Sequence, residues 1–282
     1  MKLSDALAMA SQKLSEVGVP SPQADATWLL CHVLDTNRSD LLTRITFDQE
    51  LTIEQLADFL AALSRREKRE PLQHITGKAA FRSLELNVGP GVFVPRPETE
   101  QVVQYAIDYL RQLPKPGVAI DLGTGSGAIA IAMATEVPQT KVYAVELSEA
   151  AFAYAAKNIE ANAAMVELRL GAMQNVVSDL VGGLDVVISN PPYIPNSAIP
   201  KDPEVRNYDP ELALYGGEDG LDVIRDISGI AAALLRSGGL LVLEHADGQS
   251  EAIRELLLND GWLSVNAFQD ASLRYRTITA IR

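Results

Sequence analysis

The chain has 282 residues, 47% of them hydrophobic and 22% charged, which suits one large or two ordinary globular domains. Its formal net charge of −13 disfavours nonspecific binding to DNA or RNA, because an acidic surface repels the phosphate backbone. The single cysteine, Cys31, excludes an internal disulfide and a cysteine zinc cluster; we expect it to be a buried helix residue and expect no metal site. No apolar run is long enough to span a membrane and the N-terminus does not resemble a signal peptide, so we expect a cytoplasmic protein.

The first 70 residues predict helices only. Apolar residues recur at helical spacing from Leu3 to Val17, and Ser21-Pro22 is a typical helix start. Thr52 to Gln55 fits a capping box, and the helix that it opens ends in a basic run, residues 65–70, which we expect to be solvated. Because this segment holds no catalytic cluster, we expect residues 1–70 to be a helical domain that recognises a partner.

Residues 71–95 predict a β-hairpin that links this domain to the rest of the chain. Apolar residues alternate over 84–88 and again over 92–94, and residues 89–91 (Gly-Pro-Gly) between them favour a turn. Residues 95–100 (Pro-Arg-Pro-Glu-Thr-Glu) follow, and their acids stand in the first turn of a helix predicted over 102–113.

From residue 118 onward, strands and helices alternate along the chain. The expected strands span residues 118–121, 142–146, 166–170, 185–189, 240–244, 264–268 and 277–281. The expected helices span residues 128–137, 148–161, 221–235 and 249–259. This alternation predicts a doubly wound α/β domain over residues 96–282, with a mostly parallel seven-stranded sheet. The last two strands have no helix between them, so we expect an antiparallel hairpin at one edge.

A glycine-rich loop, residues 122–127, follows the first of these strands. Glycines allow a tight turn and close approach of backbone to a ligand, and the loop also fits the dinucleotide fingerprint loosely. Asp121, before the loop, would attract an amino group but repel a pyrophosphate. Glu146, at the end of the next strand, can hold ribose hydroxyls. These acids favour S-adenosylmethionine over NAD; a glycine turn without any ligand is the remaining alternative.

A second motif, Asn190-Pro191-Pro192-Tyr193, follows the buried strand 185–189. The prolines forbid further strand, so we expect Asn190 at the carboxyl edge of the sheet, where α/β sheets bind ligands. The side-chain oxygen of Asn190 and the carbonyl oxygen of Pro191 can accept both hydrogens of an –NH₂ group, and Tyr193 can offer a stacking face. The motif therefore predicts a site for a planar amide or amine, with a plain proline-rich loop as the alternative.

The glycine loop and this motif together resemble the N-P-P-Y methyltransferases, which alkylate planar amino or amide nitrogens. Residues 71–77 (Pro-Leu-Gln-His-Ile-Thr-Gly), 95–100 and 216–221 (Gly-Gly-Glu-Asp-Gly-Leu) resemble the HemK-type (PrmC) release factor glutamine methyltransferases, and the resemblance covers essentially the whole chain. It implies a Rossmann-like class I methyltransferase that uses S-adenosylmethionine. The implied substrate is the glutamine side-chain nitrogen in the Gly-Gly-Gln motif of class 1 peptide-chain release factors, and the implied process is translation termination.

The resemblance also implies roles for individual residues. Asn190 and Pro191 would be catalytic, and with Pro192 and Tyr193 they would hold the substrate glutamine. Phe93 is a candidate wall of the substrate site. The residues expected to bind the cofactor are Asp121, Gly123, Thr124, Gly125, Ser126, Gly127, Glu146, Met173 and Asn190.

Three positions depart from the family's pattern. Glu146 stands where the family more often has Asp. Residues 171–173 (Gly-Ala-Met) replace an acid followed by an aromatic residue, so Met173 can pack on adenine but the acid's hydrogen bond is lost. His245 stands in a Glu-His-Ala sequence where the family often has Glu-Ile/His-Gly, and we interpret it as a structural histidine rather than a base.

Two other functions remain open at this point. A nucleic-acid adenine N6-methyltransferase would share the N-P-P-Y chemistry, but it needs a basic channel. A non-catalytic module would bind S-adenosylmethionine or release factors without turnover. We expect a monomer whose partner is a class 1 release factor, with no direct contact to nucleic acid or membrane. Residues 191–210 hold six of the 15 prolines, and we expect this stretch to face the substrate.

Overall fold

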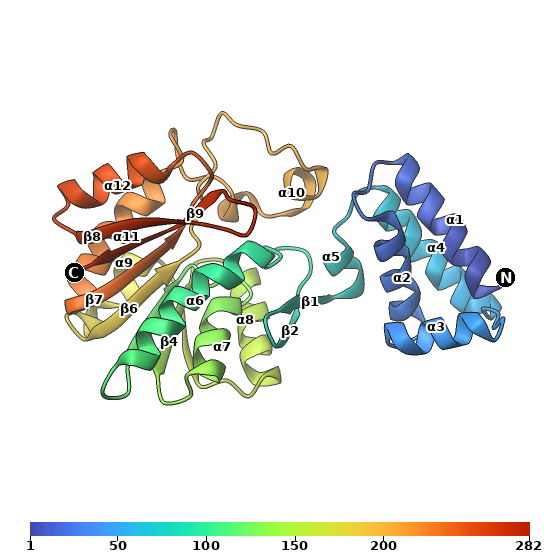
Figure 1. Ribbon diagram of the computed structural model, residues 1–282, viewed down its shortest axis with the longest axis horizontal. Coiled ribbons are helices and arrows are strands. Elements are labelled where there is room, and N and C mark those ends of the chain that lie inside the picture. The colour runs from blue at the N-terminus through green and yellow to red at the C-terminus, as the bar shows by residue number, and fades with distance from the viewer. The chain divides into compact units, whose positions relative to one another are not determined.

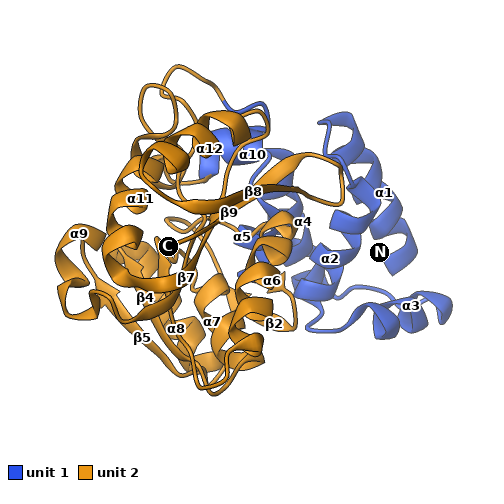
Figure 2. Cartoon of the chain, turned by 60° about the vertical axis from the view of Figure 1, so that its left-hand side comes forward, with its two compact units in different colours: residues 1–78, 200–208 blue, residues 79–199, 209–282 orange.

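The computed structural model describes residues 1–282, which divide into two compact units (Figure 2). The helical unit comprises residues 1–78 and 200–208, and the sheet unit comprises residues 79–199 and 209–282. These boundaries differ from the expected ones, because residues 71–78 and 200–208 pack with the N-terminal helices. No helix combines the length and the apolar character that crossing a membrane requires.

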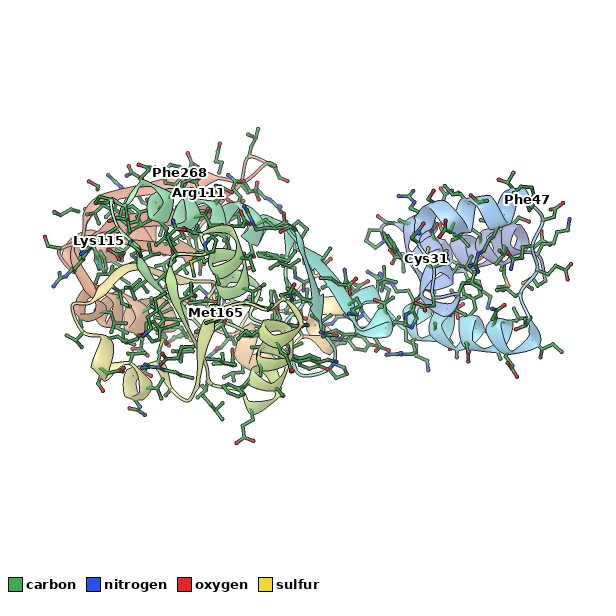
Figure 3. The ribbon with its side chains drawn as sticks, turned by 90° about the horizontal axis from the view of Figure 1, so that it is seen from below. Cys31, Phe47, Arg111, Lys115, Met165 and Phe268 are labelled. Atoms are coloured by element: carbon green, nitrogen blue, oxygen red, sulfur yellow. The ribbon has the colours of Figure 1, made fainter.

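The helical unit is built on five helices from the N-terminal part of the chain (Figure 1). They are α1 (Leu3–Glu16), α2 (Pro22–Val33), α3 (Arg38–Thr46), α4 (Ile53–Glu67) and α5 (Leu72–Thr76). The predicted capping box is confirmed: Thr52 Oγ1 accepts from the Gln55 N–H at 3.1 Å, and Gln55 Oε1 accepts from the Thr52 N–H at 3.0 Å. Ser21 makes no side-chain cap at α2. Cys31 is buried in the core of this unit, as predicted (Figure 3).

A short helix from far along the chain, α10 (Pro203–Tyr208), belongs to the helical unit. Its Glu204 accepts from Arg66 Nη1 at 2.8 Å and from Arg69 Nη2 at 2.7 Å. Arg66 is only 5% exposed and also donates from Nε to Asp25 at 2.7 Å. The expectation that the basic run is solvated is therefore wrong for Arg66, whose buried charge is paired with two carboxylates.

The two-stranded hairpin lies earlier in the chain than predicted. Its strands are β1 (Lys78–Phe81) and β2 (Leu84–Asn87). Arg82, in the turn, adopts a left-handed φ of 53°, and its guanidinium donates to Glu136 Oε1 at 2.5 Å, which holds the turn against the sheet unit. Val92 and Val94 are buried but form no strand. The prediction that residues 89–91 join two strands is therefore wrong: the apolar alternation over 92–94 reflects burial of an irregular segment.

The sheet unit contains a seven-stranded sheet with the order β5-β4-β3-β6-β7-β9-β8. The strands are β3 (Val118–Leu122), β4 (Lys141–Glu146), β5 (Val166–Leu170), β6 (Leu184–Ser189), β7 (Leu235–Glu244), β8 (Leu263–Gln269) and β9 (Tyr275–Ile281). All pairs are parallel except β7–β9 and β8–β9. This confirms the predicted mostly parallel α/β fold and the antiparallel hairpin, with β8 at the edge and β9 beside β7.

Helices cover both faces of this sheet (Figure 1). One face carries α6, α7 and α8, and the other carries α9, α11 and α12. Their bounds, with those of two 3₁₀ helices, are α6 (Pro97–Gln112), α7 (Ala128–Glu136), α8 (Glu149–Ala161), α9 (Met173–Val176), η1 (Ser178–Leu180), η2 (Glu211–Ala213), α11 (Asp222–Leu234) and α12 (Ser250–Asn259). The strands β4 and β5 lie on one side of β3, and β6 and the later strands lie on the other, so the strand order reverses between β3 and β6. Ligands of open α/β sheets bind at such a reversal.

Candidate active site

The carboxyl ends of β3 and β6 bring the two sequence motifs together. The strands are paired in register, with Asp121 opposite Ile188. Beyond that pair, the Ser189 hydroxyl donates to the Leu122 carbonyl at 2.5 Å. The glycine loop and Asn190 therefore leave the sheet side by side, at the reversal of strand order.

The glycine loop turns through three glycines with left-handed φ, namely Gly123 (76°), Gly125 (58°) and Gly127 (85°). A Cβ at Gly123 or Gly125 would meet no other atom within 4 Å, whereas one at Gly127 would lie 3.1 Å from Ile131. Gly127 is thus needed for close packing at the start of α7. Gly123 and Gly125 instead leave open space beside their backbone, where a ligand can approach closely.

Asp121 is fully buried beneath the glycine loop. The Thr124 hydroxyl donates to its Oδ2 at 2.5 Å, and burial raises the pKa of Asp121 to about 7. Thr124 and Ser126 are themselves buried. Asp121 therefore shapes the loop through Thr124, and its direct contact with a cofactor ammonium group stays a prediction.

Glu146 is the last residue of β4, and its carboxylate accepts hydrogen bonds from the backbone of the glycine loop and from the backbone just after the strand. Its Oε2 accepts from the Gly125 N–H at 2.7 Å, and its Oε1 accepts from the Ser148 N–H at 2.8 Å. A carboxylate offers about four acceptor positions, so two stay free for ribose hydroxyls. Its role toward a ribose remains a prediction, while its role in holding the loop is plain from these bonds.

Asn190 is half-buried, and its amide is anchored by residues that we did not single out from the sequence. Its Nδ2 donates to Thr99 Oγ1 at 3.3 Å, and the Thr99 hydroxyl donates to Glu244 Oε2 at 2.7 Å. Burial raises the pKa of Glu244 to about 7. Thr99 lies in the motif over residues 95–100, and Glu244 is the first residue of the Glu-His-Ala sequence noted above, so these two patterns were the available signals.

The backbone after Asn190 is held by close packing. A Cβ at Gly216 would collide with the Pro192 carbonyl oxygen, and one at Gly220 would collide with the Tyr193 carbonyl oxygen. The Gln249 side-chain amide also donates to the Tyr193 carbonyl at 3.0 Å. Gly216 and Gly220 therefore allow close packing against the N-P-P-Y backbone, and Gln249 is a supporting residue that sequence reasoning missed.

Phe93 and Tyr193 contribute aromatic rings to the sheet unit in different ways. The Arg96 guanidinium lies 4.7 Å above the Phe93 ring, and Arg96 Nη2 donates to Asp209 Oδ2 at 2.5 Å. Burial raises the pKa of Asp209 to about 6. It also raises the pKa of Tyr193 to about 12, which keeps the phenol neutral. One face of Phe93 is thus occupied by Arg96, and its contact with a substrate stays a prediction.

Met173 and His245 represent the departures from the family pattern. Met173 begins α9 and packs partly buried against the core, and the preceding Gly171 N–H donates to the Glu146 carbonyl at 2.8 Å. This segment therefore adjoins the end of β4. His245 is fully buried, with Nδ1 2.8 Å from the Ala246 carbonyl oxygen. Burial lowers the pKa of His245, which favours a neutral ring with a structural hydrogen bond.

The chain is similar to known proteins in sequence and in overall fold. Residues 5–77 match the family model described as the PrmC N-terminal domain, and residues 85–202 match the methyltransferase small domain. A release factor glutamine methyltransferase of Streptomyces coelicolor is 47% identical over 278 residues, covering 97% of this chain and 96% of the relative. The release factor glutamine methyltransferase of Mycolicibacterium smegmatis is 43% identical, covering 100% of this chain and 98% of the relative. A methyltransferase structure from Pyrococcus furiosus superposes with a TM-score of 0.51 at 25% identity, covering 72% of this chain and 90% of that one.

Proposed function

Because this chain belongs to the family of release factor glutamine methyltransferases, we propose that it methylates the glutamine side-chain nitrogen in the Gly-Gly-Gln motif of class 1 peptide-chain release factors. The methyl donor in this proposal is S-adenosylmethionine. The main support is that the glycine loop and Asn190 leave the neighbouring strands β3 and β6 together, joined by the bond from Ser189 to Leu122. A cofactor on the loop and an amide on Asn190 would meet over the same edge.

The residues at this edge fit S-adenosylmethionine better than a dinucleotide. The open space beside Gly123 and Gly125 admits a ligand to the backbone, and Glu146 keeps free acceptor positions for ribose hydroxyls. Two acids, Asp121 and Glu146, stand beside the loop over residues 122–127, and their charge would repel a pyrophosphate. When bound, S-adenosylmethionine supplies a methyl group on a positively charged sulfur, and these acids would attract that positive charge.

The protein's task in this reaction is to aim a poor nucleophile. The lone pair of an amide nitrogen is delocalised, so the nitrogen must be held in line with the methyl group at close distance. Asn190 Oδ1 and the Pro191 carbonyl would accept both N–H bonds of the substrate amide. These acceptors also stabilise the positive charge that develops on nitrogen during transfer. The neutral Tyr193 ring would limit access of water, and the proton would leave to solvent after transfer.

We assign substrate recognition to the helical unit. It holds no catalytic cluster, yet residues 200–208, which continue the chain from the N-P-P-Y motif, belong to it. A second contact with the release factor would raise the effective concentration of its flexible glutamine loop at Asn190. Both motifs come from one chain, so we propose a monomer, and a release factor substrate supports a proposed location in the cytoplasm.

A methyl-transfer assay tests the proposal. S-adenosylmethionine with a labelled methyl group is offered with a purified class 1 release factor, with the same factor whose Gly-Gly-Gln glutamine is replaced by alanine, and with DNA and RNA. We expect label only in the unaltered factor. Label in nucleic acid alone would make the protein an adenine methyltransferase. Cofactor binding without any transfer would make it a non-catalytic module.

A further inference from the structure

We propose that Thr99 is a positioning residue that, backed by Glu244, fixes the carboxamide of Asn190 so that Oδ1 and not Nδ2 faces the substrate nitrogen. This role deepens the proposed function and presupposes it. Thr99 would touch neither cofactor nor substrate, and would act only through Asn190.

Three elements of the sheet unit converge to make this contact. Asn190 follows β6 and Glu244 ends β7, and these strands are paired in register, with Ser189 opposite Leu243. Thr99 lies in the first turn of α6, which packs on both strands. Thr99 is 3% exposed and Glu244 2% exposed, so water does not compete strongly for their hydrogen bonds.

The direction of the bonds follows from the chemistry of the three groups. Above its pKa of about 7, the carboxyl group of Glu244 is ionised and only accepts hydrogen bonds, and a hydroxyl has one hydrogen to give. The hydroxyl of Thr99 therefore donates to Glu244, at 2.7 Å, and keeps only its lone pairs for Asn190, at 3.3 Å. Only the NH₂ end of the Asn190 amide can donate to a lone pair. The opposite end, Oδ1, is thus left to face away from Thr99.

The flipped amide would present the wrong group to the substrate. A carboxamide has nearly the same shape in its two orientations, so packing alone selects weakly between them. In the flipped orientation, the NH₂ group of Asn190 would confront the NH₂ group of the substrate, and one acceptor would be lost. The Thr99 hydroxyl makes that orientation unfavourable before any substrate arrives, which is preorganisation.

Thr99→Val removes the hydroxyl and keeps the shape, and Thr99→Ser restores the hydroxyl. On a release factor at saturating cofactor and at about pH 8.5, where Glu244 is ionised, we expect Thr99→Val to lower kcat by about tenfold, the net worth of roughly one hydrogen bond. Its cofactor affinity and its KM for the release factor should change little, and Thr99→Ser should recover most of the rate. A merely structural role would not give this separation of kcat from KM together with rescue by serine.

Thr140 provides a matched control for the loss of a buried hydroxyl. It is 5% exposed, its hydroxyl has no hydrogen-bond partner, and it precedes β4 at the amino end of the strand. Thr140→Val should keep wild-type kinetics. A folded Thr99→Val with wild-type kcat, or a Thr99→Ser as slow as Thr99→Val, would overturn the inference while the active wild type keeps the proposed function intact.

A second measurement needs no activity at all. In ¹⁵N-labelled protein, the side-chain amide signal that disappears in Asn190→Asp belongs to Asn190. We expect its protons to show nuclear Overhauser contacts to the side chain of Thr99. Their absence in the folded wild type would contradict the inferred orientation, whatever the methyl-transfer assay shows.

Discussion

Asn190 has no unusual reactivity of its own, and its proposed role follows from where β6 ends. We predict that Asn190→Ala lowers turnover by about 10²–10³-fold, as expected for loss of one preorganised polar contact in a transition state. Cofactor affinity should stay close to wild type, because the glycine loop and Glu146 supply most of the expected cofactor contacts and Asn190 only one. Single-turnover kinetics and calorimetry measure the two quantities separately. A near wild-type rate would remove Asn190 from the mechanism.

Glu244 should make the stability of the protein depend on pH. The pKa of Glu244 is about 7 in the folded protein, above its ordinary value of 4.5. Its contribution to stability is therefore complete below pH 4.5 and is lost as the pH rises through about 7. The shift corresponds to at most about 3.5 kcal/mol at about 1.4 kcal/mol per pKa unit. Glu244→Gln cannot ionise, so we predict that the variant gains stability relative to wild type between about pH 5 and pH 8.

Urea unfolding of both proteins at the two ends of that range checks this prediction. The pKa of Asp121 is also raised to about 7. Because Asp121 is present in both proteins, its effect on the unfolding free energy cancels in the comparison. A difference in unfolding free energy that stays constant with pH would mean that Glu244 does not titrate in this range.

At the scale of elements, the glycine loop needs glycine for two reasons: a left-handed backbone, and space beside that backbone for a ligand. Gly125 has a left-handed φ of 58° and open space where a Cβ would stand. We predict that Gly125→Val abolishes cofactor binding, because the side chain would fill the space that the ligand needs, while the unit still folds with some loss of stability. Calorimetry with S-adenosylmethionine gives the affinity, and thermal unfolding gives the stability.

Gly182 is a matched control for this substitution. It has a φ of 65°, equally open surroundings, and a place before β6 at the opposite end of the strand from Asn190. Gly182→Val should therefore carry a similar backbone strain and keep cofactor affinity. Equal loss of affinity in both variants would attribute the effect to strain and not to the ligand site.

At the scale of the whole molecule, the two units are expected to divide recognition and chemistry. We predict that a fragment beginning at Ala79 keeps cofactor affinity and loses mainly kcat/KM on an intact release factor. On a short Gly-Gly-Gln peptide, both proteins should be slow and nearly equal, because the peptide offers nothing for the helical unit to bind. Circular dichroism confirms that the fragment is folded before the rates are compared.

The outcome on the intact factor decides the role of the helical unit. If the folded fragment methylates a whole release factor as efficiently as the full chain, residues 1–78 do not recognise it. The pairing of Glu204 with Arg66 and Arg69 would then serve only to hold residues 200–208 in place.

Local chemistry was enough to predict the two motifs and the elements around them. Glycines that allow left-handed turns, prolines that end strands, and apolar alternation act within a few residues, so the glycine loop, the N-P-P-Y turn and all seven strands of the main sheet could be read from the sequence. The same local reasoning misplaced the hairpin. Residues 89–91 carry the stronger turn signal, whereas the true turn at Arg82 is held by Glu136, 54 residues away.

Only the tertiary structure decided which polar groups meet. Asn190 is separated from Thr99 by 91 residues, Thr99 from Glu244 by 145, and Arg69 from Glu204 by 135. Periodicity tells which side of a helix or strand is buried, but it does not tell which element ends lie together or which buried donor finds which acceptor. The sequence by itself therefore determined which polar groups stand at the sheet edge, and the fold determined which residues contact them.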